Sequence, residues 1–132
     1  MLASAKHKGV ESTLAFLAAA IVGVWGVLHV IPTLRVVQGF EPITAANRFV
    51  IVQEWIAEGM TMWGITAVVI AVTAAGAGTT VATAAYGACA GLLVALAVLT
   101  ALTGARTGNA WFRVCPFLQG AAAALLVAAA LL

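Results

Sequence analysis

RFVIVQEWIAEGMTMWG (residues 48–64) is an apolar segment that nevertheless contains two glutamates, Glu54 and Glu58. They are four residues apart, so they share one face of a helix. These two side chains are half of the chain's four acidic residues. Ionisable side chains are costly to place inside a membrane and usually serve a function there. The segment therefore predicts a membrane helix with a functional site on one face.

The composition of the whole chain supports a membrane protein. Of its 132 residues, 64% are hydrophobic and 8% are charged, whereas a soluble domain has about 25% charged residues. So few charges cannot cover the surface of a water-soluble fold. The net charge of +2 is too small and too scattered for nucleic-acid binding. We therefore expect the lipid bilayer to be the solvent for most of the surface.

The uncharged stretches place four membrane spans in one all-α domain, a four-helix bundle with short loops. Residues 12–34, 59–105 and 114–132 contain no charge. One span needs about 20 residues, so residues 59–105 must hold part of one helix, a turn and a complete second helix. Gly76 and Gly78 are the predicted breakers between those helices. The predicted spans are residues 12–31, 44–75, 79–104 and 110–131.

The N-terminal basic residues before an apolar run are typical of a signal peptide. The run continues to Pro32, so we expect a retained first span instead. The longest loop, residues 33–43, could form a short cap or a re-entrant turn. Cys89 and Cys115 are predicted to lie at different depths in the membrane, too far apart for a disulfide, and we expect free thiols.

Most polar residues are predicted to lie on one side of the membrane. With four spans, the first and third loops share a side, and the arginines in or next to them are Arg35, Arg48, Arg106 and Arg113. On the other side we expect only an N-terminal tail carrying Lys6, His7, Lys8 and Glu11. Counting basic residues places the arginine side in the cytoplasm and both termini outside. The high alanine, glycine and valine content favours a bacterial plasma membrane, the inner membrane.

Three stripes of polar and aromatic residues point to a shared cavity. Helical spacing of four puts Trp25 with His29 on the first helix and Glu54 with Glu58 on the second. The same spacing gives a stripe on the fourth helix, formed by Trp111, Cys115 and Gln119. We expect the stripes to converge on a cavity open toward the arginines. If Arg48 marks the membrane surface, Glu58 lies about 15 Å deep, near the midplane.

These stripes supply the candidate site residues. The candidate catalytic residues are Glu58, Glu54 and His29. The candidate substrate-binding residues are Trp25, Trp55, Trp63, Trp111, Arg48, Arg113 and Gln119. Each has a structural alternative, since the acids could form ion pairs with arginines and the arginines and tryptophans could anchor the helices at the interface. We expect no metal and no cofactor, because His29, Glu54 and Glu58 do not form a metal-ligand spacing signature.

Three functions remain open. The first is an isomerase or cyclase that transfers protons to and from a lipid-soluble, isoprenoid-like substrate, with Glu58 as the acid and His29 or Glu54 as the base. The second is a proton-coupled exporter of lipophilic cations, and the third is a non-catalytic accessory subunit. The small-residue motif GACAG (residues 87–91) would allow a homo-oligomer or tight packing within the bundle.

The chain also resembles the small multidrug resistance transporters in size and in the number of spans. That resemblance implies a membrane glutamate that exchanges protons for substrate. The key acid of that family lies in the first helix, whereas the predicted first span, residues 12–31, contains no acid. No site residue is therefore carried over from that family.

Overall fold

The computed structural model describes residues 2–40 and 42–132, with side chains for residues 7, 9–40 and 42–132. Its helices are α1 (Leu2–Val30), α2 (Thr33–Gln38), α3 (Ala45–Gly76), α4 (Thr80–Leu102) and α5 (Ala110–Ala130), with a short 3-10 helix η1 (Gly104–Thr107). Four of them, α1, α3, α4 and α5, are long and apolar enough to span a membrane. The predicted all-α four-helix bundle is confirmed, and the chain is a multi-pass integral membrane protein.

Capping side chains and glycines define the ends of the helices. Thr44 begins α3 by accepting a hydrogen bond from the backbone N–H of Asn47, and Thr79 begins α4 in the same way. Such caps satisfy N–H groups that have no partner within the helix. Gly76 and Gly78 form the turn between α3 and α4 with φ values of 150° and 77°, which only glycine adopts at little cost.

The first helix begins earlier than the sequence predicted. Residues 2–11 were expected to be a tail, but they belong to α1, so that expectation is wrong. Glu11 is only 3% exposed, and its carboxylate accepts a hydrogen bond of 2.5 Å from the backbone N–H of Gly78. The physical reason is that the α3–α4 turn leaves an amide without a partner, and Glu11 supplies the acceptor.

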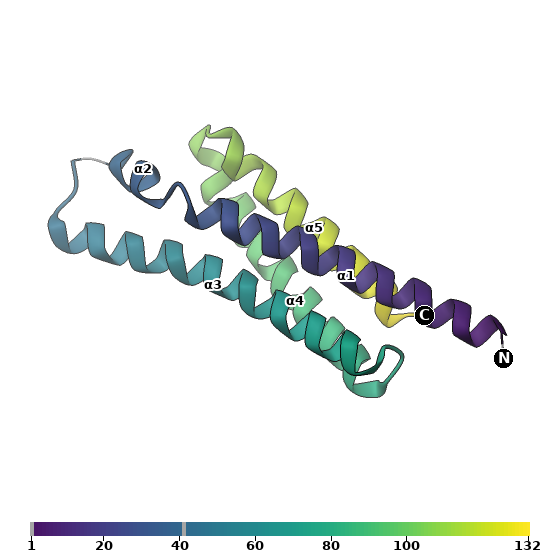
Figure 1. Cartoon of the computed structure of the whole chain (residues 1–132). Coiled ribbons are helices and arrows are strands. Elements are labelled where there is room, and N and C mark those ends of the chain that lie inside the picture. Colours follow the sequence, from purple (N-terminus) through teal and green to yellow (C-terminus); the bar gives the residue numbers. More distant parts are fainter. Residues whose placement is uncertain (1, 41) are drawn as a thin grey trace.

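The four long helices form a ring in the order α3, α1, α5, α4 (Figure 1). Both ends of the chain lie at the end of the bundle opposite α2. Small side chains fill the centre, so the helix backbones approach closely. Ala15, Ala18, Ala122 and Ala123 are all buried there. Within the GACAG motif, Cys89 and Ala90 are buried in the core, whereas Gly87 and Gly91 face open space.

At the α2 end of the bundle, α3 and α4 lose contact with the core. The buried residues of α3 begin at Gly59, fourteen residues after the helix starts by its printed bounds, and those of α4 end at Leu93. The two helices therefore pack together mainly near their connecting turn. There, the hydroxyl groups of Thr73 and Tyr86 form a buried hydrogen bond of 2.8 Å.

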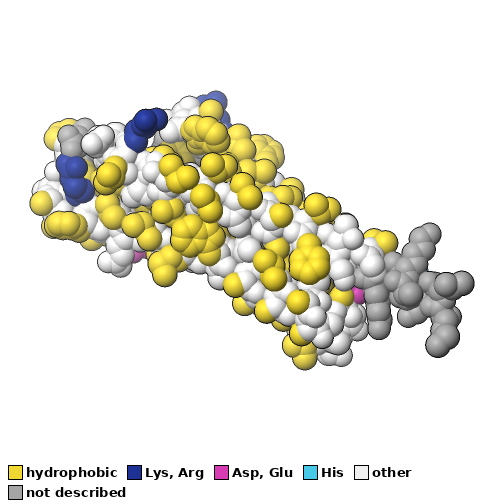
Figure 2. Space-filling view, viewed as in Figure 1, with side chains coloured by type: hydrophobic (Ala, Val, Ile, Leu, Met, Phe, Trp, Pro, Cys, Tyr) yellow, Lys and Arg dark blue, Asp and Glu magenta, His cyan; other side chains and the backbone are white. Residues whose placement is uncertain are grey.

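Helix α3 also extends past the end of α1. His29, in the last turn of α1, packs against Trp55 and Glu58, whereas α3 begins at Ala45. The ten residues between Ala45 and Trp55 correspond to about 15 Å of helix. Glu58 is thus level with the last turn of α1, and Arg48 lies on the part of α3 that projects beyond it. On the face in Figure 2, arginine side chains gather at this end.

Candidate functional site

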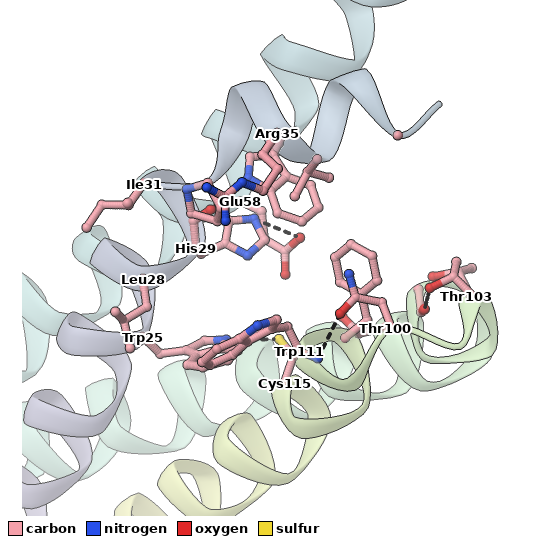
Figure 3. Close-up of a pocket in the computed structure, with 18 of the residues that line it drawn as sticks. Trp25, Leu28, His29, Ile31, Arg35, Glu58, Thr100, Thr103, Trp111 and Cys115 are labelled. Atoms are coloured by element: carbon pink, nitrogen blue, oxygen red, sulfur yellow. Dashed lines mark hydrogen bonds and ion pairs between the residues drawn. The ribbon is translucent and has the colours of Figure 1, made fainter. Parts of the chain in front are cut away.

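A cavity of about 690 Å³ opens at the α2 end of the bundle (Figure 3). Its walls come from the end of α1, from α2, from α3, from the last turns of α4, from η1 and from the first turns of α5. Ligand pockets for small molecules typically measure about 300–1,000 Å³. The polar, charged and aromatic residues discussed below are among those that line it: Trp25, His29, Arg35, Trp55, Glu58, Thr100, Thr103, Thr107, Asn109, Trp111, Phe112 and Cys115.

His29 and Glu58 form an acid–base pair on the cavity wall. The Nε2 atom of His29 lies 3.7 Å from Oε2 of Glu58. The other carboxylate oxygen of Glu58 accepts a hydrogen bond of 3.4 Å from the side-chain amide of Gln119. Three different helices, α1, α3 and α5, therefore meet at one carboxylate. The Glu58 side chain remains 27% exposed, so it can reach a molecule inside the cavity.

Trp55 fixes the position of His29. The two rings stack with centroids 4.1 Å apart and an interplanar angle of 12°. The indole N–H of Trp55 donates a hydrogen bond of 2.7 Å to the backbone carbonyl of His29. This carbonyl lies in the last turn of α1, where carbonyl groups have no partner within the helix. The Trp55 side chain thus orients the imidazole of His29 and also provides a hydrogen-bond donor for a carbonyl group at the end of α1.

The opposite wall of the cavity is aromatic. The indole N–H of Trp25 donates to the sulfur atom of Cys115, 3.1 Å away, and the Trp25 and Trp111 rings lie 6.0 Å apart. Phe112 packs edge-on against Trp55 at 5.4 Å. In Figure 3, Trp25 and Trp111 lie together on one side of the cavity, across from His29 and Glu58. Cys89 and Cys115 are both free thiols, as predicted.

Hydroxyl groups from α4 form a third side that the sequence analysis missed. Thr100 and Thr103 line the cavity together with Thr107 and Asn109 from the following segment. Arg35 of α2 is the one arginine among the lining residues. The spacing of the threonines at the end of an otherwise apolar helix was a usable signal. Threonine is common in membrane helices, however, and the third helix had no charged residue to draw attention to it.

The structure separates the predicted site residues into two groups. His29, Glu58, Trp25, Trp55 and Trp111 line the cavity, and Gln119 contacts it through Glu58. The predicted residues outside the lining are Glu54, Arg48, Arg113 and Trp63. Glu54 is exposed although it is one turn from Glu58, because the part of α3 that holds it projects beyond α1. Trp63 is 40% exposed and lies beside Gly26 of α1 instead.

Two buried polar atoms at this site have no hydrogen-bond partner among the described residues. They are Nε2 of His29 and Oε1 of Gln119, on side chains whose residues are 8% and 2% exposed. Buried polar atoms normally find a partner, so each exception calls for an explanation. The unpartnered His29 nitrogen lies in the cavity wall, where a bound molecule can reach it.

Comparison with protein-family models, curated protein sequences and solved structures finds no match for this chain.

Proposed function

We propose that this protein is a membrane isomerase or cyclase that acts by proton transfer on a lipid-soluble, isoprenoid-like substrate. The observation that carries the proposal is the contact of 3.7 Å between His29 and Glu58 on the wall of a cavity with an aromatic opposite side. General acid–base catalysis by such a positioned pair contributes about 10²–10⁴-fold to a rate. Glu58 is the proton donor and His29 is the base.

His29 and Glu58 can complete the reaction and return to their starting protonation states without another reactant. Glu58 gives its proton to one carbon of a substrate double bond, and that carbon gains a C–H bond. The resulting cation lies among the rings of Trp25, Trp55 and Trp111, whose faces attract positive charge. His29 then removes a proton from a neighbouring carbon, which restores a double bond at a new place. The proton returns from His29 to Glu58 across their contact. No electron is gained or lost.

The chemistry determines the experiment. Isomers and cyclised products have the same mass as the substrate, so lipid extracts of producing cells should contain a pair of species with equal mass and different chromatographic retention. The ratio of the pair should depend on the protein. In D₂O the product should also gain deuterium, because the transferred proton exchanges with solvent on the catalytic groups.

Glu58→Gln and Glu54→Gln form a matched pair of variants for this test. Glu58→Gln keeps the shape of the side chain and an acceptor for Gln119, but it removes the transferable proton. We expect the product ratio and the deuterium gain to fall by about 10²–10⁴-fold. Glu54→Gln removes an exposed carboxylate one turn away and should behave like the wild type. Equal activity in both variants would rule out the proposed chemistry.

The cavity also supports export of lipophilic cations as a second candidate function. A partly exposed carboxylate among aromatic rings is suited to a cation, which binds both the charge and the ring faces. Binding of tetraphenylphosphonium should then weaken as the pH falls and should be lost in Glu58→Gln. The accessory-subunit alternative predicts that Glu58→Gln has no effect while bulky residues at Gly87 or Gly91, which face outward, abolish assembly. A bacterial plasma membrane remains the proposed location.

A further inference from the structure

At the α2 end of the bundle, α3 and α4 flank one side of the cavity with a gap in close packing between them. Neither helix has a buried residue there, since burial in α3 begins at Gly59 and burial in α4 ends at Leu93. Each helix nevertheless contributes lining residues on its own side of the gap. Those on α3 are Trp55 and Glu58, those on α4 are Leu99 and Thr100, and Thr103 caps the end of α4. We call this gap the α3–α4 seam.

The hydrogen bond that joins a side chain of α3 to one of α4 lies at the opposite end of the two helices. The hydrogen bond between Thr73 and Tyr86 joins α3 to α4 near their connecting turn, far from Glu58 along the helix. The ring contacts of Trp55 go to His29 on α1 and to Phe112 on α5. The outer edge of α4 is apolar here, with Leu99 58% exposed. A hydrocarbon chain is therefore compatible with both the seam and its rim.

The polar groups at the other side of the cavity define the head of the ligand. Arg35, His29 and Glu58 line the cavity together. A hydroxyl group both donates and accepts, so one oxygen can accept from Arg35 and still form a hydrogen bond with Glu58 before and after that carboxyl group gives up its proton. The Nε2 atom of His29 is nine-tenths buried, has no hydrogen-bond partner among the described residues and faces the same space. It offers a further contact to such an oxygen.

We infer that the cavity takes an uncharged single-chain amphiphile, of the long-chain alcohol type, from the adjacent leaflet through the α3–α4 seam. Its oxygen lies among Arg35, His29 and Glu58, and its chain crosses the aromatic wall and leaves between α3 and α4. This inference rests on the proposed function for the identity of the site and adds the class of substrate and its route. The cavity lies level with the last turn of α1, where the head of a membrane amphiphile would be.

Tryptophan fluorescence tests the route directly. A Trp55→Phe/Trp63→Phe/Trp111→Phe variant keeps Trp25 as its one tryptophan, which lines the cavity and is 7% exposed. The variant is placed in bilayers of phospholipid brominated along its acyl chains. Bromine quenches on contact, so quenching of the buried Trp25 requires a chain inside the cavity. We expect clear quenching, and we expect farnesol, an uncharged long-chain alcohol, to reduce it by competition.

Two further variants separate the seam from the rest of the surface. Thr100→Phe narrows the α4 side of the seam and should remove most of the quenching by brominated lipid. Val98→Phe enlarges an exposed residue on the same helix that does not line the cavity, and it should change nothing. Iodide in the water reports on the mouth near α2 and should quench all variants equally. Loss of iodide quenching in Thr100→Phe would mean that the whole cavity had collapsed, which would overturn the assignment of Thr100 to the seam.

The outcomes distinguish this inference from the proposed function. No quenching by brominated lipid, together with a Glu58-dependent product, would overturn the seam and leave the isomerase standing. Quenching and competition by farnesol without any Glu58-dependent product would support the seam and overturn the isomerase. Competition by palmitate or by dodecylamine as strong as that by farnesol would overturn the assignment of an uncharged head.

Discussion

Gly59→Ala should disturb the site without touching any catalytic atom. Gly59 lies on the face of α3 that packs against the end of α1, next to Glu58 in the sequence. A methyl group there would collide with Cγ2 of Val30, and it would lie 3.6 Å from the carbonyl oxygen of Gly26 and 3.8 Å from Cδ2 of His29. Carbon atoms pack best at about 3.5–4.0 Å, so the last turn of α1 must retreat by roughly 1 Å.

The magnitude follows from two opposing effects on stability and one on geometry. Overpacking a close contact costs about 1–3 kcal/mol, and replacing glycine by alanine within a helix returns about 1 kcal/mol. We expect a net loss of about 0–2 kcal/mol in the free energy of unfolding. A displacement of about 1 Å at a catalytic pair can reduce a rate by about a hundredfold. Activity should therefore fall far more than stability.

The experiment combines unfolding in mixed micelles with the deuterium assay and uses two controls. Gly64→Ala lies on the same helix, where an added methyl group meets nothing within 4 Å; it should leave activity unchanged and raise the free energy of unfolding by up to about 1 kcal/mol. Val30→Ala removes the colliding methyl groups, so Val30→Ala/Gly59→Ala should recover most of the lost activity. Wild-type activity in Gly59→Ala, or no recovery in the double variant, would refute the argument that α1 and α3 hold His29 and Glu58 together by close packing.

Three further variants test the packing of the bundle. Glu11→Ala removes the acceptor for the Gly78 amide and should cost about 1.5–3 kcal/mol, with faster hydrogen exchange at Gly78 as the direct check; unchanged exchange would contradict the bond. Tyr86→Phe removes its hydrogen bond to Thr73 and should cost about 0.6 kcal/mol in a membrane protein, measured as a double-mutant cycle with Thr73→Val; a coupling of zero would contradict it. Gly87 faces open space, so Gly87→Ala should raise the free energy of unfolding of the monomer by up to about 1 kcal/mol. A lower free energy of unfolding in dilute micelles would show that other residues of the bundle cover this face of α4.

The fold was largely predictable because the bilayer leaves few choices. Uncharged stretches of sufficient length must become helices, since a backbone in hydrocarbon has to satisfy its own hydrogen bonds. The glycine turn and the boundaries of α3, α4 and α5 followed from the uncharged stretches and the glycine breakers between them. The start of α1 was missed because helix formation does not stop at the edge of the apolar run. Glu11 in particular is held by a turn distant in sequence, which no local pattern reveals.

The candidate site was only partly predictable, because spacing gives the face of a helix but not its height against a neighbour. Glu54 and Glu58 share a face by spacing, yet only Glu58 lines the cavity. The difference arises because α1 ends beside Glu58, while α3 continues beyond it. Thr100 and Thr103 carry no charge, and they line the cavity only because α4 diverges from α3. These features depend on how far each helix extends against the others.

The sequence by itself determined that this chain crosses the membrane four times and gathers its polar side chains toward one end, because lipid tolerates so few charges. Only the tertiary structure decided that His29 meets Glu58 at 3.7 Å, that Trp55 orients the imidazole, and that Glu54 is left outside. The physical reason is that the relative height and tilt of packed helices come from close contacts between small residues, summed over the bundle. Such contacts join residues that are far apart in the chain.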